Sequence, residues 1–229
     1  MYEPKLGGGG NSIVTNGLIL NLDAGNASSY NGSGTLWTDL SGQNNNGTLT
    51  NGVGYSSVNG GALTFDGVND YVKVLLNNYP IQGPGTISII ANYTSNNSNR
   101  TLLVIGDGNG GPNPNAIQIS IRNGVGIVVK SGGGTLLSYT TPTANLRQQW
   151  TLTFNGSTIK MFINGVLNAS TTTASNNTGL SNSLYMGTYQ NAGGENFVGN
   201  ISNCMIYNRV LSDIEITQNF DATKTRFGL

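Results

Sequence analysis

The sequence contains no histidine and a single cysteine, Cys204, among its 229 residues. Histidine is the most frequent general base and zinc ligand in proteins, so its absence excludes a Ser-His-Asp triad and a histidine-ligated zinc centre. One cysteine cannot close an internal disulfide or supply a thiolate cluster. Cys204 lies within an apolar segment, so we expect a small buried side chain in a protein made in a reducing compartment.

Charge is also scarce, because 9% of the residues are charged and 10 basic side chains balance 10 acidic ones. A soluble domain usually has about 25% charged residues. This balance provides no basic surface for nucleic acid or anionic lipid, so neither is expected as a partner. No apolar run reaches the ~18–20 residues of a membrane helix, and the N-terminus lacks the basic start and apolar core of a signal peptide. We therefore expect a soluble protein.

What the sequence does contain favours an all-β fold. The chain is 37% apolar and includes 10 Tyr, 6 Phe and 2 Trp, which is enough to build a core. The 34 glycines and the many Asn, Ser and Thr residues supply turns. Turn signals recur about every 8–12 residues between short apolar segments, which is typical of a two-sheet antiparallel β-sandwich.

Alternation of apolar and polar residues places the strands. Trp150, Leu152 and Phe154 alternate with threonines, which predicts a strand buried on one face. Asn-Gly pairs at 155–156 and 164–165 favour type I′ turns, in which both central residues have positive φ. A further hairpin is predicted for residues 59–74, and other strands at 18–23, 86–93, 101–105, 116–121, 126–130, 183–189 and 196–207. The predicted core contains Leu20, Phe65, Trp150, Leu152, Phe154, Ile163 and Ile206.

One helix is predicted near the C-terminus. Ser212 and Glu215 have the spacing of a capping box, in which each side chain satisfies a free backbone amide of the first turn. We expect this helix to end near Phe220. The predicted organisation is a glycine-rich arm (1–12), one jelly-roll domain (13–220) and a C-terminal tail (221–229).

Several stretches of the sequence are similar to laminin-G-like domains of the concanavalin A-like superfamily. They are residues 17–26 (GLILNLDAGN), 37–42 (WTDLSG), 65–72 (FDGVNDYV), 162–165 (FING) and 205–212 (MIYNRVLS). With the segment 219–224 (NFDATK), this wording resembles versions found in structural proteins of tailed bacteriophages. The resemblance implies a concanavalin A-like jelly roll with one short C-terminal helix. Fold alone does not give function.

One branch of this superfamily consists of glucanases, so the resemblance raises the question of whether the chain carries catalytic carboxylates. Those enzymes need paired carboxylates as acid and nucleophile. The glutamates of this chain are Glu3 in the arm, Glu195 in a glycine-rich loop and Glu215 in the helix cap. Asp66 and Asp70 flank a turn, where they are expected to form that turn. No catalytic residue is therefore assigned.

The resemblance also raises the question of calcium, which laminin-G-like domains often hold. Ca²⁺ takes 6–8 oxygen ligands, usually with at least two carboxylates. Asp39 and Asn46 lie in one polar loop and are the candidate ligands. The alternative is that Asp39 is a turn residue that accepts hydrogen bonds from the amides of its own loop. No other cofactor is predicted.

Two further sets of residues are candidate binding sites. Tyr189, Gln190 and Asn191 combine an aromatic ring with amide side chains, which suits a neutral sugar.

The arm contains Tyr2, Pro4 and Leu6 before a run of four glycines, and ordering glycine loses more backbone entropy than ordering any other residue. We therefore expect Tyr2, Pro4 and Leu6 to anchor the arm on a partner chain.

These observations lead to one functional hypothesis and two alternatives. The resemblance implies a non-enzymatic structural protein on the surface of a phage virion, synthesised in the host cytoplasm. It would be a capsid decoration or fibre-type protein with capsid or fibre subunits as partners. The alternatives are a glycan-binding adsorption module of a tail fibre and a free bacterial lectin-like domain. Host cell-surface glycans as ligands and a homo-oligomeric state stay open.

Overall fold

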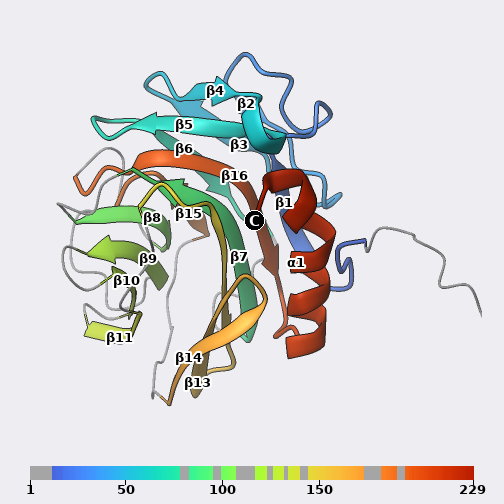
Figure 1. Cartoon of the computed structure of the whole chain (residues 1–229), viewed down its shortest axis with the longest axis vertical. Helices are drawn as coiled ribbons and strands as arrows, with labels where there is room; N and C mark the ends of the chain where they lie inside the picture. Colours follow the sequence, from blue (N-terminus) through green and yellow to red (C-terminus); the bar gives the residue numbers. More distant parts are fainter. Residues whose placement is uncertain are drawn as a thin grey trace, which may run out of the picture.

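The computed structural model describes residues 12–77, 83–94, 99–106, 117–122, 126–131, 134–139, 144–172, 182–189 and 194–229. These residues form two antiparallel eight-stranded sheets that pack face to face, with one α-helix on the outside (Figure 1). The predicted two-sheet antiparallel jelly roll is confirmed. Among the described helices, none has both the length and the hydropathy that a membrane span requires.

The first sheet, here called sheet A, is arranged around the long strand β16 (Val198–Tyr207). β16 pairs with β7 (Gly85–Tyr93) on one side and with β5 and then β1 on the other. In spatial order its strands are β14 (Val166–Thr172), β13 (Thr158–Ile163), β12 (Gln148–Phe154), β7, β16, β5 (Ala62–Asp66) and β4 (Gly54–Ser56), with β1 (Leu18–Asp23) also on β16.

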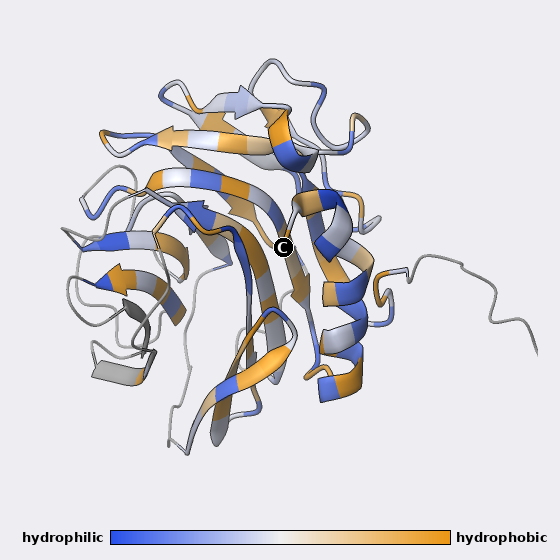
Figure 2. Ribbon diagram, in the orientation of Figure 1, coloured by the Kyte–Doolittle hydropathy of each residue, from blue (hydrophilic) through white to orange (hydrophobic). Residues whose placement is uncertain are grey.

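The second sheet, sheet B, carries the candidate site on its outer face. Its order is β11 (Gly134–Tyr139), β10 (Gly126–Ser131), β9 (Ile117–Arg122), β8 (Arg100–Ile105), β15 (Ser183–Met186), β6 (Tyr71–Leu75), β3 (Gly47–Thr50) and β2 (Leu36–Trp37). Hydrophobic and hydrophilic residues alternate along many of the strands (Figure 2). The apolar set of each sheet faces the other sheet, because successive side chains of a strand point to opposite faces.

The core lies between the sheets, and the seven core residues predicted from sequence are all buried there. Trp150 is 1% exposed and Leu20 is fully buried. Cys204 is also fully buried, and burial raises the pKa of its thiol to about 12. The prediction of a small buried cysteine is therefore confirmed.

Three local predictions are wrong. Residues 59–74 do not form a hairpin, because β5 joins sheet A and β6 joins sheet B. β12 is buried on both faces, since a second apolar cluster, which includes Phe162 and Ile216, covers sheet A from outside. Asn164 and Gly165 both have positive φ, as a type I′ turn requires, but in the 155–156 turn only Gly156 does.

The C-terminal helix is longer than predicted. α1 (Asp213–Phe227) begins with the expected capping box, in which Ser212 Oγ accepts from the Glu215 amide. It continues past Phe220 and ends at Gly228, which has the left-handed conformation typical of a C-cap. The buried face of the last turns includes Asn219 and Thr223, whose polarity hides the helical periodicity. The expected tail over 221–229 is therefore mostly helix.

Candidate functional site

A row of side chains crosses the outer face of sheet B at one level of the strands. Cross-strand pairing aligns Leu36 with Thr48, Thr48 with Lys73, and Lys73 with Tyr185. The row continues through Val104 of β8 to Gln118 of β9. Their sequence neighbours Trp37, Val72, Val74, Leu184 and Met186 face the core, so the row itself points outwards.

Exposure falls along this row from one edge of the sheet to its middle. Leu36 is 57% exposed, Thr48 is exposed and Lys73 is half-buried, whereas Tyr185 is 2% exposed. The accessible part of the row therefore lies over β2, β3 and β6. We call Leu36, Thr48, Tyr71, Lys73 and Tyr185 the sheet B platform.

The centre of the platform is aromatic and cationic. The rings of Tyr71 and Tyr185 have centroids 6.2 Å apart and are tilted by 52°. Lys73 Nζ lies 5.6 Å from the centroid of the Tyr185 ring, within the range of a cation–π contact. Among the described residues, no carboxylate forms an ion pair with Lys73. The half-buried Tyr71 ring and the Lys73 ammonium are thus the groups here that a ligand can reach.

A polar cluster around Glu195 lies on the same face of sheet B. The Glu195 carboxylate accepts hydrogen bonds from Thr101 Oγ1 at 2.9 Å and from Gln118 Nε2 at 3.1 Å. It also forms an ion pair with Arg122. The Glu195 carbonyl accepts from the Thr101 amide at 2.7 Å. Through these contacts, the segment that begins at Gly194 is held against β8 and β9.

The electrostatics of this cluster argue against acid catalysis. Burial alone would raise the pKa of Glu195, but hydrogen bonds from Arg122, Thr101 and Gln118 outweigh burial and lower the pKa below its usual value. A general acid in glycoside hydrolysis needs a raised pKa. Glu195 is therefore a charged structural group. Its ion pair with Arg122 could not be predicted from the sequence, because the two residues are far apart along the chain.

Tyr189 follows β15 and belongs to the loop that returns to Glu195. Its amide donates to the carbonyl of Gly194 at 3.3 Å, and the Thr188 hydroxyl donates to Asn196 Oδ1 at 3.0 Å. The structure thus places Tyr189 at the end of sheet B where the Glu195 cluster lies. Gln190 and Asn191 lie outside the described residues, so the sugar-binding role of this set stays a prediction.

Asp39 and Asn46 lie together, as the calcium hypothesis requires. Asp39 Oδ1 accepts from the amides of Asn21 and Ser41, and Oδ2 accepts from Ser41 Oγ and the Asn45 amide, at 2.7–3.0 Å. Asn46 Oδ1 accepts from the Asp39 amide at 2.8 Å. This is the geometry of the turn alternative, because protein donors already occupy these oxygens. No cluster of three or more His, Cys, Asp or Glu side chains occurs among the described residues.

The other candidate catalytic carboxylates, Asp66, Asp70 and Glu215, also have structural partners. Asp70 Oδ2 accepts from the Asp66 amide at 3.1 Å, and Asp66 Oδ1 accepts from the Val68 amide at 2.8 Å. Both residues therefore form the turn between β5 and β6, as predicted. Glu215 pairs with Arg209, whose hydrogen bonds lower the pKa of Glu215 to about 2.

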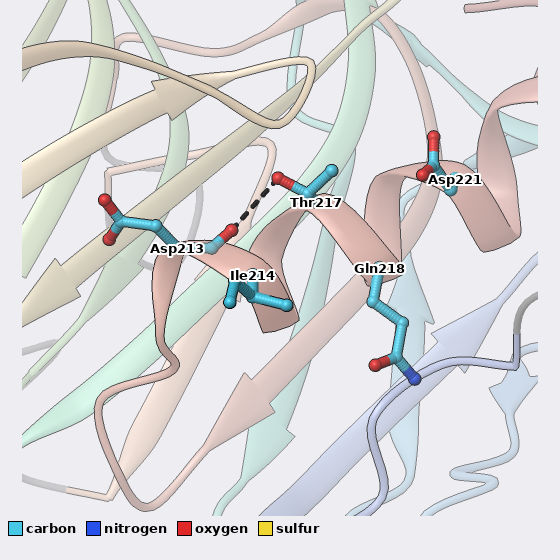
Figure 3. A pocket seen from close by; sticks show the side chains of 5 residues that line it. All are labelled: Asp213, Ile214, Thr217, Gln218 and Asp221. Atoms are coloured by element: carbon cyan, nitrogen blue, oxygen red, sulfur yellow. Dashed lines mark hydrogen bonds between the residues drawn. The ribbon is translucent and has the colours of Figure 1, made fainter.

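The predicted anchor residues Tyr2, Pro4 and Leu6 lie outside the described part of the chain. The description begins at Ser12, whose carbonyl accepts a hydrogen bond from Gln218 Nε2 of α1 at 2.8 Å. Gln218 also lines a shallow depression on the exposed side of α1, and Figure 3 shows its side chain pointing towards the N-terminal segment. The first described residue therefore lies beside this helix.

The platform was not predicted from the sequence. The alternation Tyr71-Val72-Lys73-Val74 could have shown that Tyr71 and Lys73 share one face of a strand. It could not have shown that Tyr185 lies beside them, because that contact depends on the pairing of β6 with β15.

Solved structures similar to this fold include receptor-binding domains of botulinum neurotoxins. The receptor-binding domain of the C/D mosaic serotype matches with a TM-score of 0.70 and 20% identity, over 91% of this chain and 52% of that chain. The binding domain of botulinum neurotoxin DC in complex with rat synaptotagmin II has a TM-score of 0.71 and 17% identity, over 92% and 52%. The serotype D ligand-binding domain in complex with N-acetylneuraminic acid has a TM-score of 0.69 and 20% identity, over 91% and 51%.

These similarities concern the fold. At such identities they do not transfer a ligand, and this chain spans about half the length of each domain that it matches. Among curated proteins, no sequence match was found.

The family is shown by the sequence itself. The family model Laminin_G_3, described as the concanavalin A-like lectin/glucanases superfamily, matches residues 65–217. This range covers more than half of the 229 residues and contains most strands of both sheets. The chain therefore belongs to the concanavalin A-like lectin/glucanases superfamily.

Proposed function

We propose that this protein is a non-enzymatic glycan-binding protein on the surface of a tailed-phage virion, and that the sheet B platform is its binding face. The observation that carries the proposal is that the half-buried Tyr71 and Lys73 both contact the Tyr185 ring, with the exposed Thr48 opposite Lys73 on the next strand. An aromatic face packs against the C–H face of a sugar, while hydroxyl and ammonium groups bind its hydroxyls.

The absence of enzymatic activity is supported by the state of the described glutamates. Glu195 and Glu215 both have lowered pKa values, because each is hydrogen-bonded to an arginine. Neither can donate a proton to a glycosidic oxygen near neutral pH. The botulinum domains of similar fold are described by their receptor and ligand complexes, which supports binding as the use of this sandwich.

Binding of the purified protein to a glycan array tests the proposal. We expect the wild-type protein to bind a restricted set of glycans and Tyr71→Ala to lose that binding by about tenfold or more. Val166→Ala is the control, because Val166 is a 65% exposed apolar side chain on β14 of the other sheet. Equal binding by wild-type protein and Tyr71→Ala would reject the platform.

The virion location rests on the sequence resemblance and on the arm. Four glycines separate Tyr2, Pro4 and Leu6 from the folded domain, so an arm of this kind can reach a neighbouring subunit. Deletion of residues 1–10 should leave a folded domain, because those residues precede the described fold. The truncated protein should no longer join particles; full occupancy would show that the arm is not the anchor.

The number of copies per particle distinguishes a capsid decoration protein from an adsorption protein. A capsid decoration protein should be present in hundreds of copies per purified particle, and an adsorption protein in a few to tens. Absence from purified particles would favour a free bacterial lectin-like domain.

A further inference from the structure

A second surface feature adjoins the platform at the β2 edge of sheet B. The loop between β1 and β2 encloses a shallow hollow with a volume of about 220 Å³. The hollow is lined by small uncharged side chains, including Ser28, Asn31, Ser33, Thr35 and Leu36. Hydroxyl and amide groups of this kind exchange hydrogen bonds with sugar hydroxyls without needing a charged partner.

The loop that forms this hollow is held in one conformation by its own hydrogen bonds. The buried Tyr30 donates from its hydroxyl to the Gly34 carbonyl at 3.0 Å. Ser29 Oγ donates to the Thr38 carbonyl at 2.5 Å, and the Thr38 amide donates to the Ser29 carbonyl at 2.8 Å. A ligand that enters the hollow therefore does not have to order the loop, which lowers the entropic cost of binding.

Leu36 connects the hollow to the platform. It lines the hollow and is also the first member of the row that continues through Thr48 and Lys73 to Tyr185. Three strand spacings separate Leu36 from Tyr185, which corresponds to about 14 Å. The exposed Leu36 and Thr48 thus form a continuous surface between the hollow and the half-buried Lys73 and Tyr71.

From this continuity we infer that the binding site is extended and takes an oligosaccharide. One end of the oligosaccharide lies on Tyr71 and Lys73, and the next sugar units lie over Thr48 and Leu36 and reach into the hollow. This inference rests on the proposed function and names its ligand class. The lining of the hollow is uncharged, so the units bound there are neutral sugars. A single terminal sugar would fill only one end of the surface.

The test is a titration of the best-binding array glycan and of its mono- and disaccharide fragments against matched variants. Ser28→Ala/Thr35→Val removes two hydroxyls from the hollow. Because one neutral hydrogen bond contributes about 0.5–1.5 kcal/mol, we expect this variant to lose about tenfold in affinity for the full glycan and nothing for the monosaccharide. Tyr71→Ala should weaken both ligands. Thr172→Val, at an exposed threonine of β14, is the control and should change neither.

The outcomes distinguish this inference from the proposed function. If the affinity of the wild-type protein does not rise with glycan length, or the hollow variant binds every fragment as the wild type does, the extended site is wrong and the platform stands. If Tyr71→Ala binds as the wild type does, or no saccharide binds at any length, the proposed function fails and the extended site fails with it. Equal melting temperatures of all variants are required, since a folding defect would weaken every ligand alike.

Discussion

Trp150 shows how one side chain stabilises the sandwich. It is 1% exposed, lies in β12 between β7 and β13, and belongs to the main core cluster. Trp150→Ala removes a large apolar volume that the two sheets cannot refill, so we expect the free energy of unfolding to fall by about 3–5 kcal/mol. Urea denaturation measures this change. Val68→Ala, at a 66% exposed side chain, should stay within about 0.5 kcal/mol of the wild type.

Glu215 makes stability depend on pH in a defined window. Hydrogen bonds from Arg209 lower its pKa from the ordinary 4.5 to about 2, so the folded state favours the carboxylate. The resulting stabilisation is present above pH 4.5 and is lost as the pH falls towards 2. Because the pair is solvent-accessible, Glu215→Gln should lower the free energy of unfolding by about 1 kcal/mol or less at pH 7.

The difference between wild type and Glu215→Gln should vanish near pH 2, as measured by urea denaturation at several pH values. Both proteins share the titration of Glu195, so the difference isolates Glu215. A difference that is constant from pH 7 to pH 2 would show that the ion pair with Arg209 does not operate.

Asp39 gives a prediction about metal removal. Its carboxylate oxygens accept four hydrogen bonds from Asn21, Ser41 and Asn45. Because these donors already occupy both oxygens, EDTA should leave the melting temperature nearly unchanged. A large decrease that added Ca²⁺ reverses, and that Asp39→Ala abolishes, would instead identify this loop as a metal site.

The β13–β14 turn and helix α1 are coupled through a glycine. Gly165 has a φ of +78°, and a Cβ at this position would lie 3.2 Å from Phe220 Cβ of α1. Gly156 has a similar φ of +91°, but a Cβ added there would have no neighbouring atom within 4 Å. Both substitutions to Ala meet the left-handed penalty of about 1–2 kcal/mol. Only Gly165→Ala also forces Phe220 of α1 to shift by a few tenths of an ångström. We therefore expect a larger loss of thermal stability for Gly165→Ala than for Gly156→Ala; equal losses would mean that α1 accommodates the methyl group.

Local patterns predicted the elements better than their assembly. The short apolar segments located β1, β7 and β12, because the signal of a strand lies in consecutive residues, although all three strands are buried on both faces. The same signal could not assign β5 and β6 to different sheets, since that depends on pairing with β16 and β15. The end of α1 was missed because Asn219 and Thr223 are buried by hydrogen bonding rather than by hydrophobicity.

For the whole molecule, the two faces of the sandwich differ in what covers them. Sheet A is covered by α1 and the N-terminal segment through the cluster of Val14, Phe162, Met205, Tyr207 and Ile216. On sheet B, the platform leaves Leu36 and Thr48 exposed and Lys73 half-buried. The proposed ligand-binding face is therefore the outer face of sheet B, on the other side of the sandwich from α1.

The most direct test is to map a bound glycan by NMR, using backbone amide shifts of isotope-labelled protein titrated with the best-binding array glycan. We expect the shifted amides to cluster at Thr48, Tyr71, Lys73 and Tyr185, with no change along α1. Shifts confined to α1, or to the loop around Asp39 and Asn46, would contradict the assignment of the binding face to sheet B.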